Sequence, residues 1–86
     1  MTDKRLLVFT ILARTLSFSE TARQTGISQP AVSKHIAALE SEIGAALFVR
    51  YGRTVALTEK GLALLQIAEK ILDGYAQIVV VIQMIN

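Results

Sequence analysis

The chain has 86 residues, of which 52% are hydrophobic and 19% are charged, so we expect one small folded domain with an appendage rather than a disordered segment. It contains no cysteine and one histidine, which excludes disulfides, thiolate metal sites and a zinc site built from histidines alone. The formal net charge of +2 divides into +3 over residues 1–58 and −1 over residues 59–86, so a polyanionic partner would bind the first two thirds of the chain.

The N-terminal segment predicts an amphipathic helix over residues 3–16, with Thr2 as its N-cap. Four apolar residues recur at helical spacing: Leu6, Phe9, Ala13 and Leu16. A secretory signal peptide is the competing interpretation, but the segment carries Asp3, its apolar run is brief and no small-residue cleavage site follows.

Two further helices are predicted around a tight turn. Ser19 is expected to cap a short helix over residues 20–24, which ends at Gly26. Ser28 is expected to cap a longer helix that ends at Gly44. One face of this longer helix is an apolar stripe, predicted to be buried: Val32, Ile36, Leu39 and Ile43. Two helices joined by a short glycine-containing turn are typical of a helix-turn-helix.

The other face of the longer helix is polar near its N-terminus. Gln29, Pro30, Ser33 and Lys34 lie there, with no acidic residue among them. A helix N-terminus carries free N–H groups and partial positive charge, which suit an anion. His35, beside Ile36, is interpreted as a partly exposed helix residue rather than a base-reading residue.

A short hairpin follows, because residues 47–51 and 54–57 are β-prone and flank Gly52 and Arg53. With Arg50 and Arg53 near its tip, it is interpreted as the basic wing of a winged helix-turn-helix. The competing interpretation is a solvated loop that happens to be basic.

Thr58 is expected to cap a last helix that runs nearly to the C-terminus. Six residues follow an a/d heptad rhythm along it: Leu65, Ala68, Leu72, Tyr75, Val79 and Ile82. A second apolar row beside them makes the face too broad for one small domain to cover. We therefore expect a partner, most simply a second copy of the chain. The uncharged tail, residues 74–86, is too short to span a bilayer.

The stretch "SFSETARQTGISQPAVSKHIAALESEIGAALFVRYGRTVALTEKG" resembles the LysR-type transcriptional regulators in "SQPAVS", "LE", "LF", Arg50, Arg53 and "LTEKG". The resemblance covers about residues 4–72. It implies a mainly α winged helix-turn-helix DNA-binding domain over residues 1–58 and a linker or dimerisation helix over residues 59–86. The larger effector-binding domain of that family is absent, so we expect a piece of a longer protein. Four positions depart from the usual residues of the family: Thr21, Thr25, Ala37 and Ala38.

In this interpretation the longer helix enters the DNA major groove. The Gln29 amide can pair with adenine, Lys34 can reach guanine or a phosphate, and Pro30 can contact a thymine methyl group. Ser33 can donate to a base edge or a phosphate, and Arg53 is expected in the minor groove. The remaining three predicted DNA-binding residues are assigned to phosphates: Ser19, Ser28 and Arg50. Arg50 could instead support the hairpin. The two serines could equally be plain helix caps.

The predicted function is therefore sequence-specific binding of double-stranded DNA by a cytoplasmic, nucleoid-associated bacterial regulator. A homodimer would bind a near-palindromic operator. The resemblance also implies that a full-length protein could form higher oligomers. A small-molecule effector would act only through the absent domain. No cofactor, metal, catalytic residue or membrane partner is predicted. The alternative is a helical protein-interaction module that uses the apolar C-terminal helix. An enzyme is rejected because Ser28, Ser33 and His35 lie within one helical stretch without a third orienting group.

Overall fold

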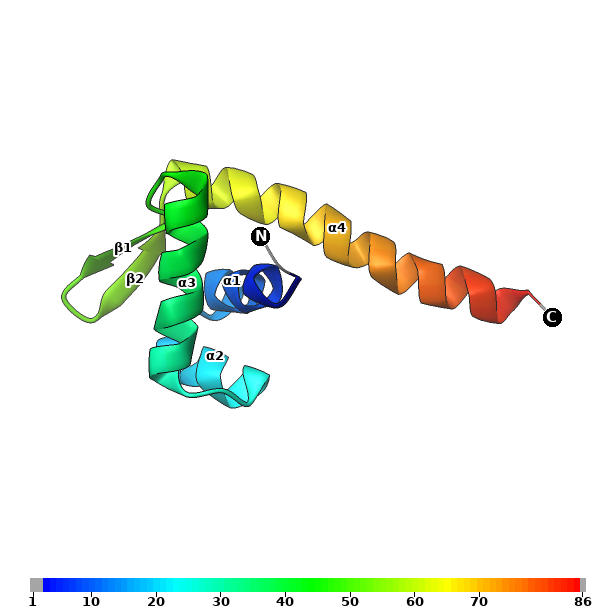
Figure 1. Cartoon of the computed structure of the whole chain (residues 1–86), viewed down its shortest axis with the longest axis horizontal. Coiled ribbons are helices and arrows are strands. Elements are labelled where there is room, and N and C mark those ends of the chain that lie inside the picture. Colours follow the sequence, from blue (N-terminus) through cyan, green and yellow to red (C-terminus); the bar gives the residue numbers. More distant parts are fainter. Residues whose placement is uncertain (1–2, 86) are drawn as a thin grey trace.

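The computed structural model describes residues 3–85, apart from the side chains of residues 3, 75, 76 and 79. In this part of the chain, four helices and one hairpin follow one another: α1 (Asp3–Thr15), α2 (Phe18–Thr25), α3 (Gln29–Ile43), β1 (Phe48–Tyr51), β2 (Thr54–Leu57) and α4 (Glu59–Met84). Helices α1–α3 pack together, the hairpin projects on one side of α3, and α4 extends away on the other (Figure 1). The predicted winged helix-turn-helix with a long C-terminal helix is confirmed.

Most of the predicted helix boundaries are confirmed by their caps. The Ser28 hydroxyl accepts a hydrogen bond from the Ala31 N–H at 3.2 Å, and the Thr58 hydroxyl accepts one from the Gly61 N–H at 3.0 Å. Gly44 ends α3 in the left-handed conformation, with φ +80°. Helix α1 ends at Thr15, one residue earlier than predicted, because Leu16 is left-handed with φ +52°. The predicted cap Thr2 lies outside the described residues.

The cap of α2 is Ser17, so the prediction of Ser19 as the cap is wrong. Ser17 has the extended backbone that an N-cap needs, and its hydroxyl accepts a hydrogen bond from the Glu20 N–H at 3.1 Å. Ser19 already lies inside the first turn of the helix. The signal in the sequence is "SFSE", in which a serine and a glutamate three residues later form the pattern of a capping box.

The core lies between α1, α3 and the start of β1. Its fully buried members include Phe9, Leu12, Leu39 and Leu47, and the rings of Phe9 and Phe48 pack with centroids 5.5 Å apart. Because buried large side chains of this kind stabilise a domain by several kcal/mol each when compared with alanine, this cluster holds α3 in place.

The predicted apolar stripes are confirmed except at their C-terminal ends. Val32, Ile36 and Leu39 are buried along α3, but Ile43 is 39% exposed, because it is the last helical residue and lies at the end of the packed interface. Leu16 is 42% exposed for a related reason, since it follows the last turn of α1 and its backbone no longer continues the helix.

Thr21, which departs from the resembled family, is fully buried in α2. Its hydroxyl lies 2.9 Å from that of Thr15, so both polar groups are satisfied inside the fold. Thr25, a second departure, uses its hydroxyl to donate to the Thr21 carbonyl at 2.7 Å. Thr21 therefore acts in the contact between α1 and α2, and Thr25 acts within α2.

The hairpin is antiparallel and pairs Phe48 with Leu57 and Arg50 with Val55. Since residues opposite each other or two apart share one face of a strand pair, these four side chains form its inner face. Gly52 turns the chain at the tip with φ +60°.

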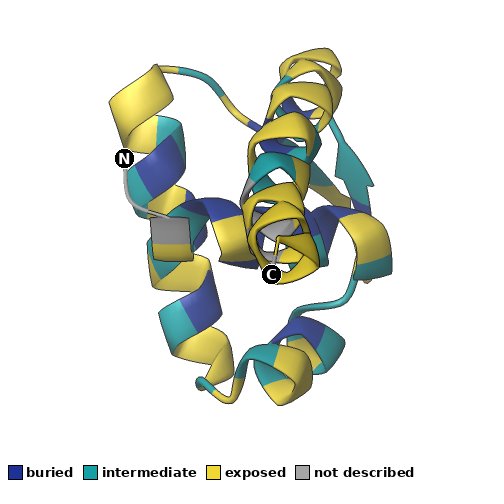
Figure 2. Ribbon diagram, turned by 90° about the vertical axis from the view of Figure 1, so that its right-hand side faces the viewer, coloured by how far each residue is buried: buried dark blue, intermediate teal, exposed yellow. Residues whose placement is uncertain are grey.

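Helix α4 has two parts with different surroundings. Its first part packs on α1, where Ala68 is 0% exposed, Leu64 and Leu65 join the core, and an ion pair links Arg14 to Glu69 at 3.5 Å. Beyond that point the helix leaves the domain and is almost entirely exposed (Figure 2).

This division changes the predicted dimer face. Ala68 is buried within its own chain and is not available to a partner, which corrects the prediction for this residue, and Leu65 contributes to the chain's own core. Leu72 is half-buried and Ile82 is 62% exposed. The side chains of Tyr75 and Val79 lie outside the described residues.

Over residues 3–85, no helix combines the length and the apolarity needed to cross a membrane.

Candidate nucleic-acid interface

A groove of about 600 Å³ lies between the start of α2, the start of α3 and the hairpin. Nine residues line it: Leu16, Ser17, Phe18, Ser19, Gln29, Arg50, Gly52, Arg53 and Val55. Four of the eight residues predicted to contact DNA are among them, from three separate elements. The fold therefore brings together side chains that lie as far apart in the sequence as Ser19 and Arg53.

The first turn of α3 contributes Gln29 to this groove, and the other predicted residues of the helix lie in solvent beside it. Gln29, Pro30, Ser33 and Lys34 are all exposed, and no acidic residue occupies that turn. Ser28 is also exposed, and although its hydroxyl oxygen accepts the capping hydrogen bond, its O–H remains free to donate to a ligand. The uncapped N–H groups and the helix dipole add partial positive charge.

A second, smaller hollow of about 140 Å³ continues from the groove between α3 and the hairpin. It is lined by Phe18, Ser33, Ile36, Ala37, Glu40, Phe48 and Arg50. Glu40 is the acidic residue in this lining, and its carboxylate accepts hydrogen bonds from the backbone N–H groups of Leu47 at 2.8 Å and Phe48 at 3.4 Å. These hydrogen bonds hold the start of β1 against α3.

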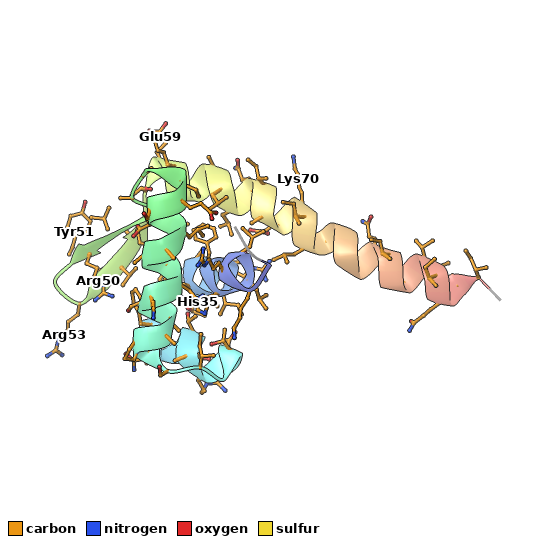
Figure 3. All side chains as sticks on the ribbon, viewed as in Figure 1. His35, Arg50, Tyr51, Arg53, Glu59 and Lys70 are labelled. Carbon is orange, nitrogen blue, oxygen red and sulfur yellow. The ribbon has the colours of Figure 1, made fainter. Side chains whose placement is uncertain are left out.

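Arg50 forms the boundary between the two hollows, because it lines both. Its guanidinium carbon lies 4.1 Å from the centre of the Phe18 ring, within the range of a cation–π contact. The labelled side chain extends from the hairpin toward the helices, whereas Arg53 extends away from the hairpin tip (Figure 3). Sequence reasoning missed both Ser17 and Phe18 as members of this surface.

The ion pairs leave the positive charge of the groove uncompensated. Arg5, Arg14 and Arg23 pair with glutamates, namely Glu42, Glu69 and Glu20. Among the residues that the structure describes, Lys34, Arg50 and Arg53 take part in no salt bridge of this kind. The cations on α3 and the hairpin therefore remain available for an external anion, as do Lys4, Lys60 and Lys70 on α1 and α4.

Glu20 lies beside the groove and keeps its negative charge over a wide pH range. Hydrogen bonds from Arg23, and from Gln24 at 3.0 Å, lower the pKa of its carboxyl group to about 2. Its carboxylate accepts these hydrogen bonds on the exposed surface of α2.

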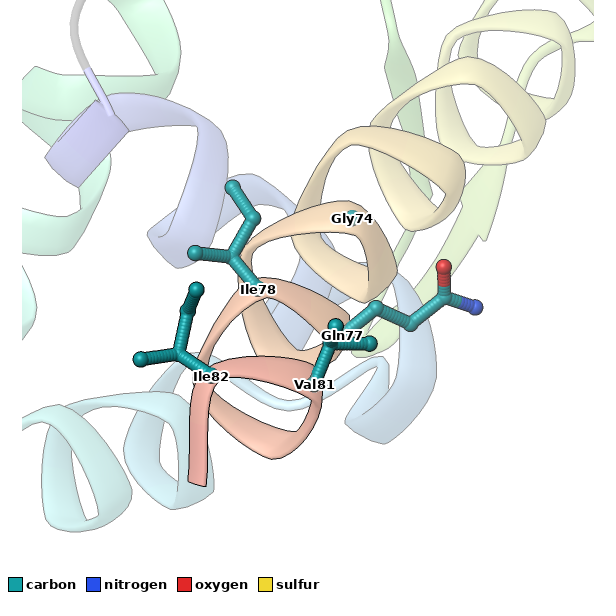
Figure 4. A pocket seen from close by; sticks show the side chains of 5 residues that line it. All are labelled: Gly74, Gln77, Ile78, Val81 and Ile82. Atoms are coloured by element: carbon teal, nitrogen blue, oxygen red, sulfur yellow. The ribbon is translucent and has the colours of Figure 1, made fainter. Parts of the chain in front are cut away.

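A third hollow, of about 310 Å³, is apolar and lies on the exposed part of α4. It is lined by Gly74, Gln77, Ile78, Val81 and Ile82. Ile78 and Ile82 extend side by side from the same face of the helix (Figure 4).

Within the described residues, no group of three metal-ligating side chains is close enough to hold a metal ion.

Residues 4–62 match the family model described as "Bacterial regulatory helix-turn-helix protein, lysR family". One relative is an uncharacterised HTH-type transcriptional regulator in the ibpB-leuC intergenic region of Azotobacter vinelandii, 52% identical over 79% of this chain and 47% of that protein. Another is the HTH-type transcriptional regulator CitR of Bacillus subtilis, 43% identical over 87% of this chain and 26% of that protein. The chain thus spans less than half the length of these relatives.

Solved structures of LysR-family regulators are also similar to this chain. The DNA-binding domain of BenM in complex with catB site 1 DNA has a TM-score of 0.91 at 33% identity, over 99% of this chain and 94% of that chain. Full-length CbnR in complex with its target DNA has a TM-score of 0.83 at 30% identity, over 90% of this chain and 27% of that chain. Both of these structures contain DNA.

Proposed function

The chain belongs to the LysR family of bacterial regulatory helix-turn-helix proteins, and on this premise we propose that it is a sequence-specific DNA-binding module that regulates transcription. The observation that carries the proposal is the groove that joins the first turn of α3 to the hairpin. Its hydrogen-bonding and cationic side chains come from three elements, and their charges are not neutralised by ion pairs among the described residues.

Helix α3 is proposed to enter the major groove with its N-terminus leading. Gln29 and Lys34 are exposed on the first turns, where an amide can pair with adenine N6 and N7 and an ammonium group can reach guanine. Pro30 is exposed beside them and offers an apolar contact to a thymine methyl group, and Ser33 can donate to a base edge or a phosphate.

The hairpin is proposed as a wing beside the minor groove. Arg53 is exposed at its tip, and an arginine is attracted by the negative potential of a narrow minor groove. Arg50, Ser19 and Ser28 are assigned to backbone phosphates, which set the position of the protein without reading sequence. Ser17, which lines the same groove, joins this set.

A second copy is proposed to cover the exposed part of α4. Ile71, Ile78 and Ile82 are exposed there, and Leu72 is half-buried, so the apolar face left uncovered by the chain's own core is long enough for a paired helix. Two copies would place two α3 helices on a near-palindromic operator. A cytoplasmic, nucleoid-associated location is part of the proposal. Higher oligomers and regulation by a small-molecule effector are proposed only for a protein that joins this chain to an effector-binding domain. The proposal includes no enzymatic step.

The base-reading role of α3 is tested with Gln29→Ala. On the operator enriched from a random pool, this variant is expected to lose about 1–3 kcal/mol of binding free energy and to lose preference at one base pair. On random duplex DNA the loss should be small. Gln66→Ala removes the same group from an exposed position on α4 and should bind both DNAs like the unchanged chain. Equal losses on operator and random DNA would refute base reading by Gln29.

A further inference from the structure

Arg50 occupies an unusual position for a cation, on the inner face of the hairpin. Its cross-strand neighbour is Val55, which is 9% exposed, and Phe48 and Leu57 on the same face pack against the core. The side chain is exposed, so the guanidinium group stays in contact with water, and a partner within the chain serves to fix its direction rather than to offset a loss of hydration.

The partner is an aromatic ring rather than a carboxylate. The guanidinium carbon lies 4.1 Å from the centre of the Phe18 ring. Glu40 lines the same hollow, but its carboxylate accepts the Leu47 and Phe48 N–H groups, and within the described residues no salt bridge links Arg50 to an acid.

This choice of partner leaves the hydrogen-bonding edge of Arg50 available. A cation–π contact uses the flat face of the guanidinium group, whereas its five N–H donors lie in the plane and point outward. An arginine paired with a carboxylate would have to give up that pair before it could bind another anion. Stacked on Phe18, Arg50 can bind a phosphate through its edge without losing an interaction.

The ring itself is held in place from two sides. Phe18 is the first residue of α2, directly after the Ser17 cap, and its side chain packs against the hydrophobic core. The direction of the Arg50 side chain is therefore set by the start of α2 as well as by the strand that carries it. This contact links the helix-turn-helix to the wing.

We propose that Phe18 is a positioning residue for DNA binding: its ring holds the guanidinium group of Arg50 at the edge of the groove, with its N–H donors directed at a backbone phosphate. This inference rests on the DNA-binding function proposed above. It assigns no base contact to Phe18, so its effect on affinity should be the same for every DNA sequence.

The test is a double-mutant cycle on duplex DNA with Phe18→Leu, Arg50→Ala and the double variant. Because an exposed cation–π contact is worth about 0.5–1 kcal/mol, Phe18→Leu should weaken binding about two- to fivefold. Arg50→Ala should weaken it more and reduce the salt slope by about 0.9, the value for one phosphate. In the Arg50→Ala background, Phe18→Leu should cause no further loss. A Phe18→Leu effect of equal size in both backgrounds would overturn the proposal.

Two further variants separate positioning from packing. Phe18→Tyr keeps the ring face and should retain wild-type affinity. Site-specific replacement of Phe18 by 3,4,5-trifluorophenylalanine keeps the shape but weakens the ring's attraction for a cation, so it should reproduce the loss seen with Phe18→Leu even if that variant folds poorly. Unchanged affinity with the fluorinated ring would contradict the inference. If the unchanged chain fails to bind duplex DNA, the proposed function fails; if it binds without coupling between Phe18 and Arg50, only this inference fails.

Discussion

Gly61 is the position where the smallest change should have the largest effect on folding. It lies in the first turn of α4 and is buried against Leu47, directly before β1, and Leu57, at the end of β2. A Cβ atom at this position would lie 2.2 Å from the carbonyl oxygen of Leu47 and 2.9 Å from a methyl carbon of Leu57. The Leu57 side chain can rotate, but the Leu47 oxygen belongs to the backbone and also accepts a hydrogen bond from the Thr58 N–H at 3.0 Å.

Gly61→Ala should therefore destabilise the domain although alanine favours helices. Relief of the contact requires a shift of α4 by roughly 1 Å or more, toward ordinary van der Waals separation. Such a shift would strain the Thr58 hydrogen bonds to Leu47 and, at 2.7 Å, to Ala46. Overpacking costs about 1–3 kcal/mol and each weakened hydrogen bond about 1 kcal/mol, against a helix-propensity gain of about 1 kcal/mol. We expect a net loss of roughly 3 kcal/mol.

The measurement is urea unfolding followed by far-ultraviolet circular dichroism, at concentrations where the chain is monomeric by sedimentation, because association would stabilise the fold by mass action. Gly74→Ala is the matched control, since a Cβ atom at this position in the same helix meets nothing within 4 Å. It should leave the midpoint unchanged or slightly raised. A Gly61→Ala variant as stable as the unchanged chain would refute the reasoning.

Two further predictions concern α1 and α2. Leu16→Gly should stabilise the domain by up to about 1 kcal/mol in the same unfolding measurement. A left-handed φ costs a non-glycine residue about 1–2 kcal/mol, and the greater entropy of glycine in the unfolded chain cancels only part of the gain from removing this strain. Leu16→Ala keeps the strain and should give no gain. The Glu20 carboxyl group should titrate by NMR near pH 2, below its ordinary pKa of 4.5. Its folded pKa is depressed, so the contribution of its hydrogen bonds to stability is present above pH 4.5 and is lost as the pH falls toward 2. Arg23→Ala should return the pKa toward 4.5, and an unchanged value would contradict the assigned cause.

The sequence was sufficient to predict α3 and the wing because their signals are local. A capping serine, a proline in the first turn and a glycine at the end all lie within the helix they bound, and Ser28 and Gly44 occupy the predicted positions. The exposed first turn of α3 follows from the same pattern, since burial of Val32, Ile36 and Leu39 leaves the opposite face in solvent.

Other features depend on the tertiary fold and could not be predicted. A heptad pattern does not distinguish contact with a helix of the same chain from contact with a second copy. It therefore predicts a dimer contact for Ala68, which packs within its own domain. Nothing in the sequence around Gly61 indicates that its backbone lies close to the Leu47 carbonyl group. The stacking of Arg50 on Phe18 joins α2 to β1, and no sequence pattern around either residue predicts this contact.

The most direct test of the account is binding of the purified chain to random duplex DNA and to a pool enriched by selection, each titrated with salt. We expect enrichment of a near-palindromic site and an affinity that falls with salt by a slope of about −0.9 for each phosphate neutralised. Lys70→Ala, on the outer surface of α4 (Figure 3), should leave both results unchanged. A folded, dimeric chain that binds no DNA at low salt would contradict the account and favour a protein-interaction module.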